Sequence, residues 1–151
     1  MRNCLVIFSL ILISCFSAKG QEEKEQEYVQ EELSFTMQIK DYNFSGMCIM
    51  NIYDIEGDKE IVGTIVNQFG VKALDFTFTR ERVKILNVIA PIDKWYIRKI
   101  LRRDFYFILT NLWSADNVEK RGRKFINLPN GEKQITNKHL AIEYTFSPMQ
   151  N

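Results

Sequence analysis

Hydrophobic and polar residues alternate along much of the chain after residue 33, which is the pattern of β-strands with one buried face. Apolar residues occupy every second position between residues 33 and 40, whereas residues 46–53 are apolar on both alternating sets of positions. Turn signals such as Ile55-Glu56-Gly57-Asp58 separate these runs from three further ones, at residues 60–67, 74–79 and 83–89. The pattern predicts a five-stranded antiparallel meander in which segment 46–53 needs cover on both faces.

A helical pattern follows the predicted meander. Pro91 ends the sheet, and Asp93 is placed to cap a helix that begins near Lys94. Apolar residues then recur at intervals of three and four, the spacing of a helix face that lies on a core: Ile97, Ile100, Leu101, Ile108, Leu109 and Leu112. Because Asp104 is also a suitable N-cap residue, the sequence leaves open whether this segment forms one helix or two.

The last third of the chain returns to strand patterns. Residues 114–123 are polar and predict a loop, and Pro129-Asn130-Gly131 predicts a hairpin between strands at 124–128 and 132–136. Residues 140–146 predict the final strand. The expected fold class is therefore α+β, mainly β: a curled antiparallel sheet of about eight strands, half-barrel-like, with a helical segment inserted after the fifth strand as a plug for the hollow.

The first 20 residues have a different character. Arg2 precedes the apolar run Cys4–Phe16, which is too short to cross a bilayer and is typical of a signal peptide. Leu12-Ile13-Ser14-Cys15 resembles a bacterial lipobox, in which the cysteine is acylated, while Ala18-Lys19-Gly20 is the competing site for an ordinary signal peptidase. The predicted organisation is a signal peptide (1–20, lipobox 12–15), an acidic tether (21–32) and one β-rich domain (33–151).

Composition and charge narrow the range of functions. Hydrophobic residues make up 46% of the chain and charged residues 26%, the balance of a folded globular domain. Loss of residues 1–20 removes Arg2 and Lys19 from the 20 basic residues and leaves 18 against 19 acidic ones, so we expect no nucleic-acid partner. The charge is uneven, because residues 21–32 carry six Glu and one Lys whereas residues 94–103 carry five basic residues and no acid.

Few residues are suited to catalysis. His139 is the only histidine, which excludes a Ser-His-Asp triad and a multi-histidine metal site within one chain. Cys48 is the only cysteine after residue 20, and we interpret it as a buried small hydrophobe. The scattered glycines form no phosphate-binding loop. We therefore expect no enzyme and no cofactor; a spatial pair of carboxylates stays open, although Asp75 and Glu143 are expected to be solvated.

Two sets of residues are candidates for binding. Cations and aromatic residues interleave after Pro91, which predicts a membrane-surface site at Lys94, Trp95, Arg98, Lys99 and Arg102; an ordinary solvated helix face is the alternative. The doubly apolar strand predicts a hollow that binds lipid or lipoprotein acyl chains, with Met47, Ile49, Phe76, Phe78 and Ile100 as its lining. The alternative is a structural or adaptor lipoprotein that binds another envelope protein through a strand edge or the basic helix.

Three segments carry a resemblance to known proteins. The lipobox at 12–15, the segment Gly70–Phe78 and the segment Lys99–Phe105 together resemble small uncharacterised lipoproteins of Bacteroidota-type bacteria. More distantly, a curled sheet plugged by helices on an acylated anchor is similar to the LolA and LolB family of lipoprotein carriers and receptors. This resemblance implies an apolar hollow for acyl chains, no catalysis, and an outer-membrane anchor with the domain facing the periplasm. It transfers no functional residue, because no diagnostic motif aligns position by position.

Overall fold

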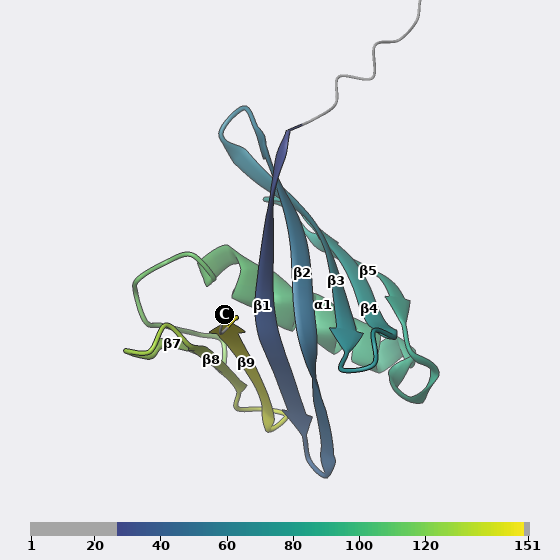
Figure 1. Ribbon diagram of the computed structural model, residues 1–151. Coiled ribbons are helices and arrows are strands. Elements are labelled where there is room, and N and C mark those ends of the chain that lie inside the picture. Colours follow the sequence, from purple (N-terminus) through teal and green to yellow (C-terminus); the bar gives the residue numbers. More distant parts are fainter. Residues whose placement is uncertain (1–26, 150–151) are drawn as a thin grey trace, which may run out of the picture.

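The computed structural model describes residues 27–149, which form a sheet of nine antiparallel strands and two helices (Figure 1). The strands are β1 (Tyr28–Ile39), β2 (Tyr42–Ile55), β3 (Asp58–Asn67), β4 (Lys72–Phe78), β5 (Val83–Val88), β6 (Val118–Lys120), β7 (Arg123–Asn127), β8 (Lys133–Asn137) and β9 (Ile142–Pro148). The helices are the short 3-10 helix η1 (Ala90–Ile92) and the α-helix α1 (Trp95–Asn111). The predicted signal peptide, its lipobox with Cys15, and residues 21–26 of the predicted tether lie outside the described residues.

The strand order is β5-β4-β3-β2-β1-β9-β8-β7-β6. The chain therefore builds a five-stranded meander, passes through α1, and returns as a second meander whose last strand pairs with the first. The sheet curls around α1 without closing, as Figure 1 shows. This arrangement confirms the predicted mainly β fold, the curled half-barrel-like sheet and the helix after the fifth strand.

Two glycines let neighbouring strands approach each other closely where the sheet bends. A Cβ atom on Gly46 of β2 would lie 1.9 Å from the carbonyl oxygen of Val66, and one on Gly63 of β3 would lie 2.1 Å from the ring of Phe76. The β3–β4 register also shifts between Ile65 and Val66. A bulge bends the strand that contains it, and glycine permits the close contact beside it.

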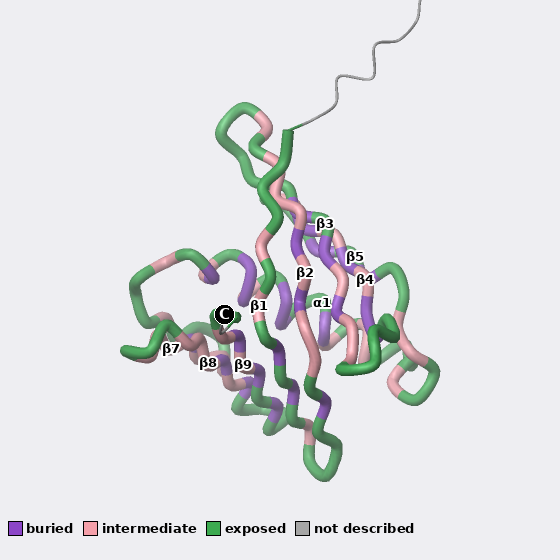
Figure 2. Tube along the Cα trace, viewed as in Figure 1, coloured by how far each residue is buried: buried purple, intermediate pink, exposed green. Residues whose placement is uncertain are grey.

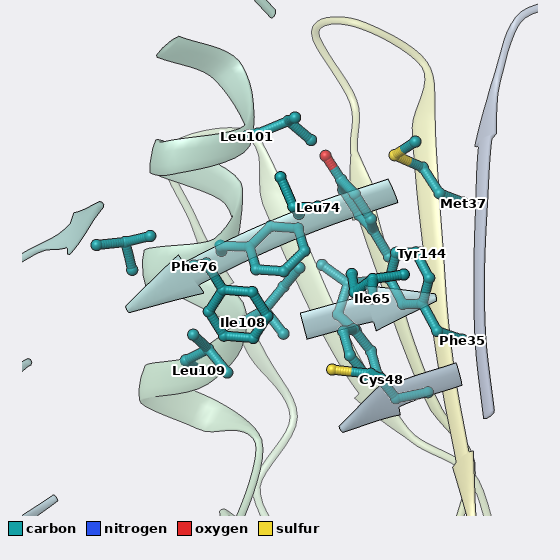
Figure 3. Close-up of a cluster of buried hydrophobic side chains, with 14 of the residues drawn as sticks. Phe35, Met37, Cys48, Ile65, Leu74, Phe76, Leu101, Ile108, Leu109 and Tyr144 are labelled. Carbon is teal, nitrogen blue, oxygen red and sulfur yellow. The ribbon is translucent and has the colours of Figure 1, made fainter. Parts of the chain in front are cut away.

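The core lies between the concave face of the sheet and one face of α1. Figure 2 shows buried positions recurring along the strands and along the helix. The helix buries Leu101, Phe105, Ile108, Leu109 and Leu112 against the concave face. Figure 3 shows Leu101, Ile108 and Leu109 on the helix opposite side chains of the strands. Each such side chain contributes about 1.5–3 kcal/mol when fully buried, so this interface is the main source of apolar stabilisation.

Strand β1 begins at Tyr28, five positions before the start that the sequence predicts. Residues 28–32 pair with Tyr53–Ile49 of β2, so they belong to the sheet and not to a tether. The Tyr28 ring packs on the Tyr53 ring at 5.5 Å between centroids, and Trp113 Nε1 donates a hydrogen bond to Glu31 Oε2 at 2.8 Å. The prediction was wrong because residues 28–32 are mostly polar and show no apolar alternation, so only their pairing with β2 identifies them as part of the strand.

Helix α1 is one continuous helix from Trp95 to Asn111. Of the two possibilities that the sequence leaves open, one helix and two, the structure has one, since the Asp104 carboxylate lies inside the fold and caps nothing. The predicted cap at Asp93 is wrong: Lys94 is the N-cap residue and makes no side-chain capping bond, whereas Asp93 accepts a 2.5 Å hydrogen bond from Arg98 Nε. Within residues 27–149, no helix combines the length and the apolar character needed to span a bilayer.

The second meander contains one strand more than predicted. Val118–Lys120, in the segment predicted as a loop, forms the short edge strand β6 opposite Arg123–Phe125 of β7. The final strand begins at Ile142 instead of Leu140, because Ala141 adopts a φ of 50° in the preceding turn. Short polar segments such as β6 have no hydrophobic alternation, so only their pairing partner identifies them as strands.

Candidate functional site

The five residues predicted to line an acyl-chain site do not form one site. Phe76 and Phe78 on β4 are buried on the concave face, and Ile100 on α1 is partly buried beside them. Met47 and Ile49 lie on the convex face, so the sheet separates them from the others. The predicted lining is therefore split between two surfaces.

The split follows from the register of β2. Cys48 pairs with Leu33 of β1 and with Ile65 of β3, and all three face the core. Met50 pairs with Gly63 of β3, and Gly63 in turn pairs with Phe76 of β4. A strand that is apolar on both faces gives no signal for which face points inward. Cys48 and Met50 are the buried set, which the sequence did not distinguish from Met47 and Ile49.

The concave side of the sheet is filled by side chains of α1. The Phe105 ring lies 5.1 Å from the Phe76 ring and 6.2 Å from the Tyr144 ring, measured between centroids. The cavity left between helix and sheet measures about 10 Å³. Its lining is Phe35, Met37, Phe44, Ile65, Ala73, Leu74, Ile92, Leu101 and Phe105. Such a space holds about one water molecule, so an acyl chain would need α1 to move away first.

A buried carboxylate connects α1 to the second meander. Asp104 is 1% exposed; Arg123 Nε donates to its Oδ1 at 2.6 Å, Tyr144 OH donates to its Oδ2 at 2.7 Å, and Asn137 Nδ2 lies 3.0 and 3.1 Å from the two oxygens. Burial, together with the negative charge of Asp104, raises the pKa of Tyr144 well above its ordinary value. The phenol therefore stays protonated and remains a donor, as a closed structural network requires.

The sequence contains a signal for this network, although the hydrophobic pattern alone does not identify it. Asp104 occupies a position in the apolar stripe of α1, between Leu101 and Ile108. Burial of a carboxylate at such a position is costly unless the carboxylate is paired. Asn137 is equally buried, and among the described residues its Oδ1 has no hydrogen-bond partner. This cluster holds the fold together, and each of its charged groups is used in doing so.

The surface of α1 opposite the core is cationic and aromatic. We define the cationic face as Lys94, Trp95, Lys99, Arg102 and Arg103; all five are exposed, and Trp95 is 77% exposed. Among the described residues, none of its four cations lies within ion-pair distance of a carboxylate. Because the helix's one acidic residue is the inward-facing Asp104, the exposed side of α1 carries positive charge alone.

Arg98 departs from the predicted membrane-surface set. Its guanidinium binds Asp93 and lies 3.4 and 3.2 Å from the carbonyl oxygens of Ile85 and Leu86 on β5. It therefore covers the outer edge of β5 and is neutralised by its partner. Of the other four predicted residues, Trp95, Lys99 and Arg102 are exposed on α1, and Lys94 is exposed at its N-cap; Arg103 joins them.

The described residues offer little nucleophilic or metal chemistry. Cys48 is fully buried, and burial, reinforced by the nearby charge of Glu31, raises the pKa of its thiol well above the ordinary value, so the thiolate is disfavoured. No group of three His, Cys, Asp or Glu side chains placed to hold a metal ion occurs in residues 27–149. Cys48 is thus a packing residue.

Asp75 on the convex face is held more firmly than the solvated acid that the sequence predicts. Its side chain is 16% exposed, and it accepts hydrogen bonds from Thr64 Oγ1 at 2.6 Å and from Asn87 Nδ2 at 2.9 Å. Partial burial alone would raise its pKa, but these two bonds and the Lys72 ammonium outweigh burial and hold the pKa of Asp75 below its ordinary value. Glu143, in contrast, is exposed as predicted.

We expect Asp75→Asn to lower the free energy of unfolding by about 1 kcal/mol at neutral pH. Because the folded pKa is below the unfolded one, the contribution is complete above the unfolded value of 3.8 and is lost as the pH falls toward the folded value. Urea unfolding at pH 7 and pH 3 should show a difference that shrinks in acid. Asp41→Asn, at an exposed turn, is the control; an equal difference at both pH values would contradict the assignment.

Comparison with protein-family models, with curated proteins and with solved structures finds no match for this chain. The resemblance to Bacteroidota-type lipoproteins and to the LolA and LolB family therefore stays a prediction. The candidate site therefore rests on the geometry of the chain alone, and the cationic face of α1 is the surface with the most distinctive chemistry.

Proposed function

We propose that this chain is a non-enzymatic lipoprotein of the cell envelope, anchored through an acylated Cys15, that lays the cationic face of α1 on an anionic membrane surface. The observation that carries the proposal is the combination of four unpaired cations and an exposed tryptophan on one helix, with the helix's acid turned into the core. Anionic headgroups attract the cations, and an amphipathic ring such as Trp95 is stabilised at the boundary between headgroups and acyl chains.

The expected strength of this contact is moderate. A Lys or Arg near an anionic membrane contributes about 1 kcal/mol, so four cations supply an attraction of several kcal/mol that salt weakens. An acylated lipobox cysteine carries a diacylglyceryl group, and two acyl chains already give stable anchoring. The cationic face is therefore suited to orient the anchored domain on the membrane surface.

The length of chain before β1 is compatible with this placement. Between Cys15 and Tyr28 lie residues 16–27, which span at most about 40 Å when extended. Glu31 of β1 binds Trp113, which follows the C-terminal end of α1, and the helix measures about 25 Å. A segment of this length is therefore able to connect the start of β1 to an anchor in the membrane that α1 contacts.

The test is binding to phosphatidylglycerol vesicles by the soluble chain that begins at Gln21. We expect salt-sensitive cosedimentation, and we expect Lys99→Gln combined with Arg102→Gln to weaken it about 30-fold, because two cations contribute about 2 kcal/mol. In a Trp113→Phe background, the fluorescence of Trp95 should shift to shorter wavelength when vesicles are added.

The matched control is Lys40→Gln combined with Lys84→Gln, which removes the same charge from the β1–β2 turn and from β5. This variant should bind vesicles nearly as well as the original chain. Equal weakening by both pairs would mean that net charge alone matters. Binding that is indifferent to the helix variants would contradict the proposal and would leave the cationic face as a solvated surface or a site for an acidic protein.

Binding of acyl chains inside the domain, which the doubly apolar strand and the resemblance both predict, stays a prediction. The contacts of Phe105 with both meanders leave space for about one water molecule at the predicted hollow. The geometry therefore favours a binding surface outside the fold over a cavity within it.

A further inference from the structure

The first five residues of β1 have an open edge. Tyr28–Glu32 pair with β2 on one side, but on the other side β1 pairs with β9 only from Leu33, which lies opposite Pro148. Beyond Pro148, no other strand among residues 27–149 continues along this edge. Within residues 27–149, the backbone donors and acceptors on this side of Tyr28–Glu32 therefore have no partner strand, and an added strand is able to continue the line of β9.

The outer edge of β5, at one end of the sheet, is covered by a side chain. The guanidinium of Arg98 covers the carbonyl oxygens of Ile85 and Leu86 on the outer edge of β5. Nothing comparable covers Tyr28–Glu32 in the described part of the chain, and Val29 is 69% exposed there. The two edges thus differ in whether a further strand is able to pair with them.

Charge decides which strand fits the open edge. Glu27, Glu31 and Glu32 lie on or beside it, and no basic residue occurs from Glu27 to Ile39. Of the two glutamates in β1, Glu32 is on the convex face, whereas Glu31 is on the concave side and is bound by Trp113. Opposite charges on paired strands stabilise a sheet, and like charges destabilise it. A second copy of this chain would bring three more glutamates to the same place, so its charge opposes pairing edge to edge.

We propose that the open edge of β1 binds an extended segment of another protein in which basic and apolar residues alternate. The added strand runs antiparallel to β1 and continues from the end of β9. Its basic side chains lie beside Glu32 on the convex face, and its apolar side chains lie beside Val29 on the concave side, near Trp113, whose indole binds Glu31. This docking does not depend on the membrane contact of α1, because the two surfaces share no residue.

The probe is an end-blocked peptide in which valine and lysine alternate, added to the soluble chain from Gln21. We expect hydrogen exchange at the amides of residues 28–32 to slow when the peptide is present. Glu32→Lys should weaken binding about five-fold, since a favourable cross-strand pair becomes a repulsive one. Glu60→Lys, which makes the same change at an exposed position of β3, should leave the affinity unchanged.

Three results would overturn the inference. Unchanged exchange at residues 28–32 would show that no strand is added there. Equal binding of a peptide with glutamate in place of lysine would show that the charge of the edge does not select its partner. Protection of the same amides without peptide, rising with protein concentration, would identify a second copy as the occupant. The Lys99→Gln, Arg102→Gln variant should bind the peptide normally, which separates this test from that of the proposed membrane contact.

Discussion

Replacing Asp104 with alanine is expected to lower the free energy of unfolding by about 3–5 kcal/mol, a large part of the stability of a domain of this size. The substitution leaves Arg123 without its buried ion-pair partner and removes the acceptor of Tyr144 and Asn137. These groups come from β7, β8 and β9, so the loss loosens the contact between α1 and the whole second meander. Urea unfolding followed by circular dichroism measures the change.

Two variants separate the buried network from the helix as such. Asp104→Asn keeps the shape of the side chain and one acceptor oxygen, so we expect it to cost less than the alanine variant while still destabilising. Asp93→Ala, at the exposed start of α1, should leave the free energy of unfolding nearly unchanged, because its ion pair with Arg98 is exposed to solvent. A loss below about 1 kcal/mol for Asp104→Ala would mean that apolar packing, and not the network, holds α1 in place.

The sequence predicted the strands that combine alternation with clear turn residues. The β2–β3 hairpin forms at Ile55–Asp58 as expected, with Glu56 and Gly57 both at positive φ, and Pro129-Asn130-Gly131 separates β7 from β8. In these segments the local pattern and the long-range pairing agree. The strand β6 and the first five residues of β1 were missed. Their own residues are mostly polar, so only the strands with which they pair identify them.

The candidate site was predicted in part, for a similar reason. A cationic helix face is visible in the sequence, because basic residues at helical spacing have no other place than the surface. The sequence pattern does not show that Arg98 pairs with Asp93. This ion pair neutralises Arg98, which therefore does not belong to the cationic face. The acyl-chain lining failed as a set because it required the inward face of β2, and that face is fixed by register with β1 and β3.

These observations favour a functional surface outside the half-barrel over a site within it. The concave face that would receive a guest is occupied by Phe105 and its neighbours on α1, and the buried charge of Asp104 fixes the helix in this position. The helix thereby presents its cationic face outward, while the sheet leaves one edge of β1 open. A module with two independent surfaces and a packed interior is suited to hold a partner at a membrane.

Gly46→Ala is expected to be the second severe change, with a loss of about 3 kcal/mol in the free energy of unfolding. The added methyl group would lie 1.9 Å from the carbonyl oxygen of Val66 and 3.0 Å from the Cα of Asn67. Both atoms belong to the backbone of β3, which is paired with β2 through Met47 and Gly46 themselves. The strands must therefore separate, and the bend that seals the concave face is lost.

Thermal unfolding and binding of a hydrophobic dye measure this effect together. We expect Gly46→Ala to melt at lower temperature and to bind the dye before it unfolds, because a flatter sheet exposes the side chains that α1 covers. Ser45→Ala, at the neighbouring exposed position, should behave like the original chain within about 0.5 kcal/mol. If Gly46→Ala proved as stable as Ser45→Ala, the close approach of β2 and β3 would not be what curls the sheet around the helix.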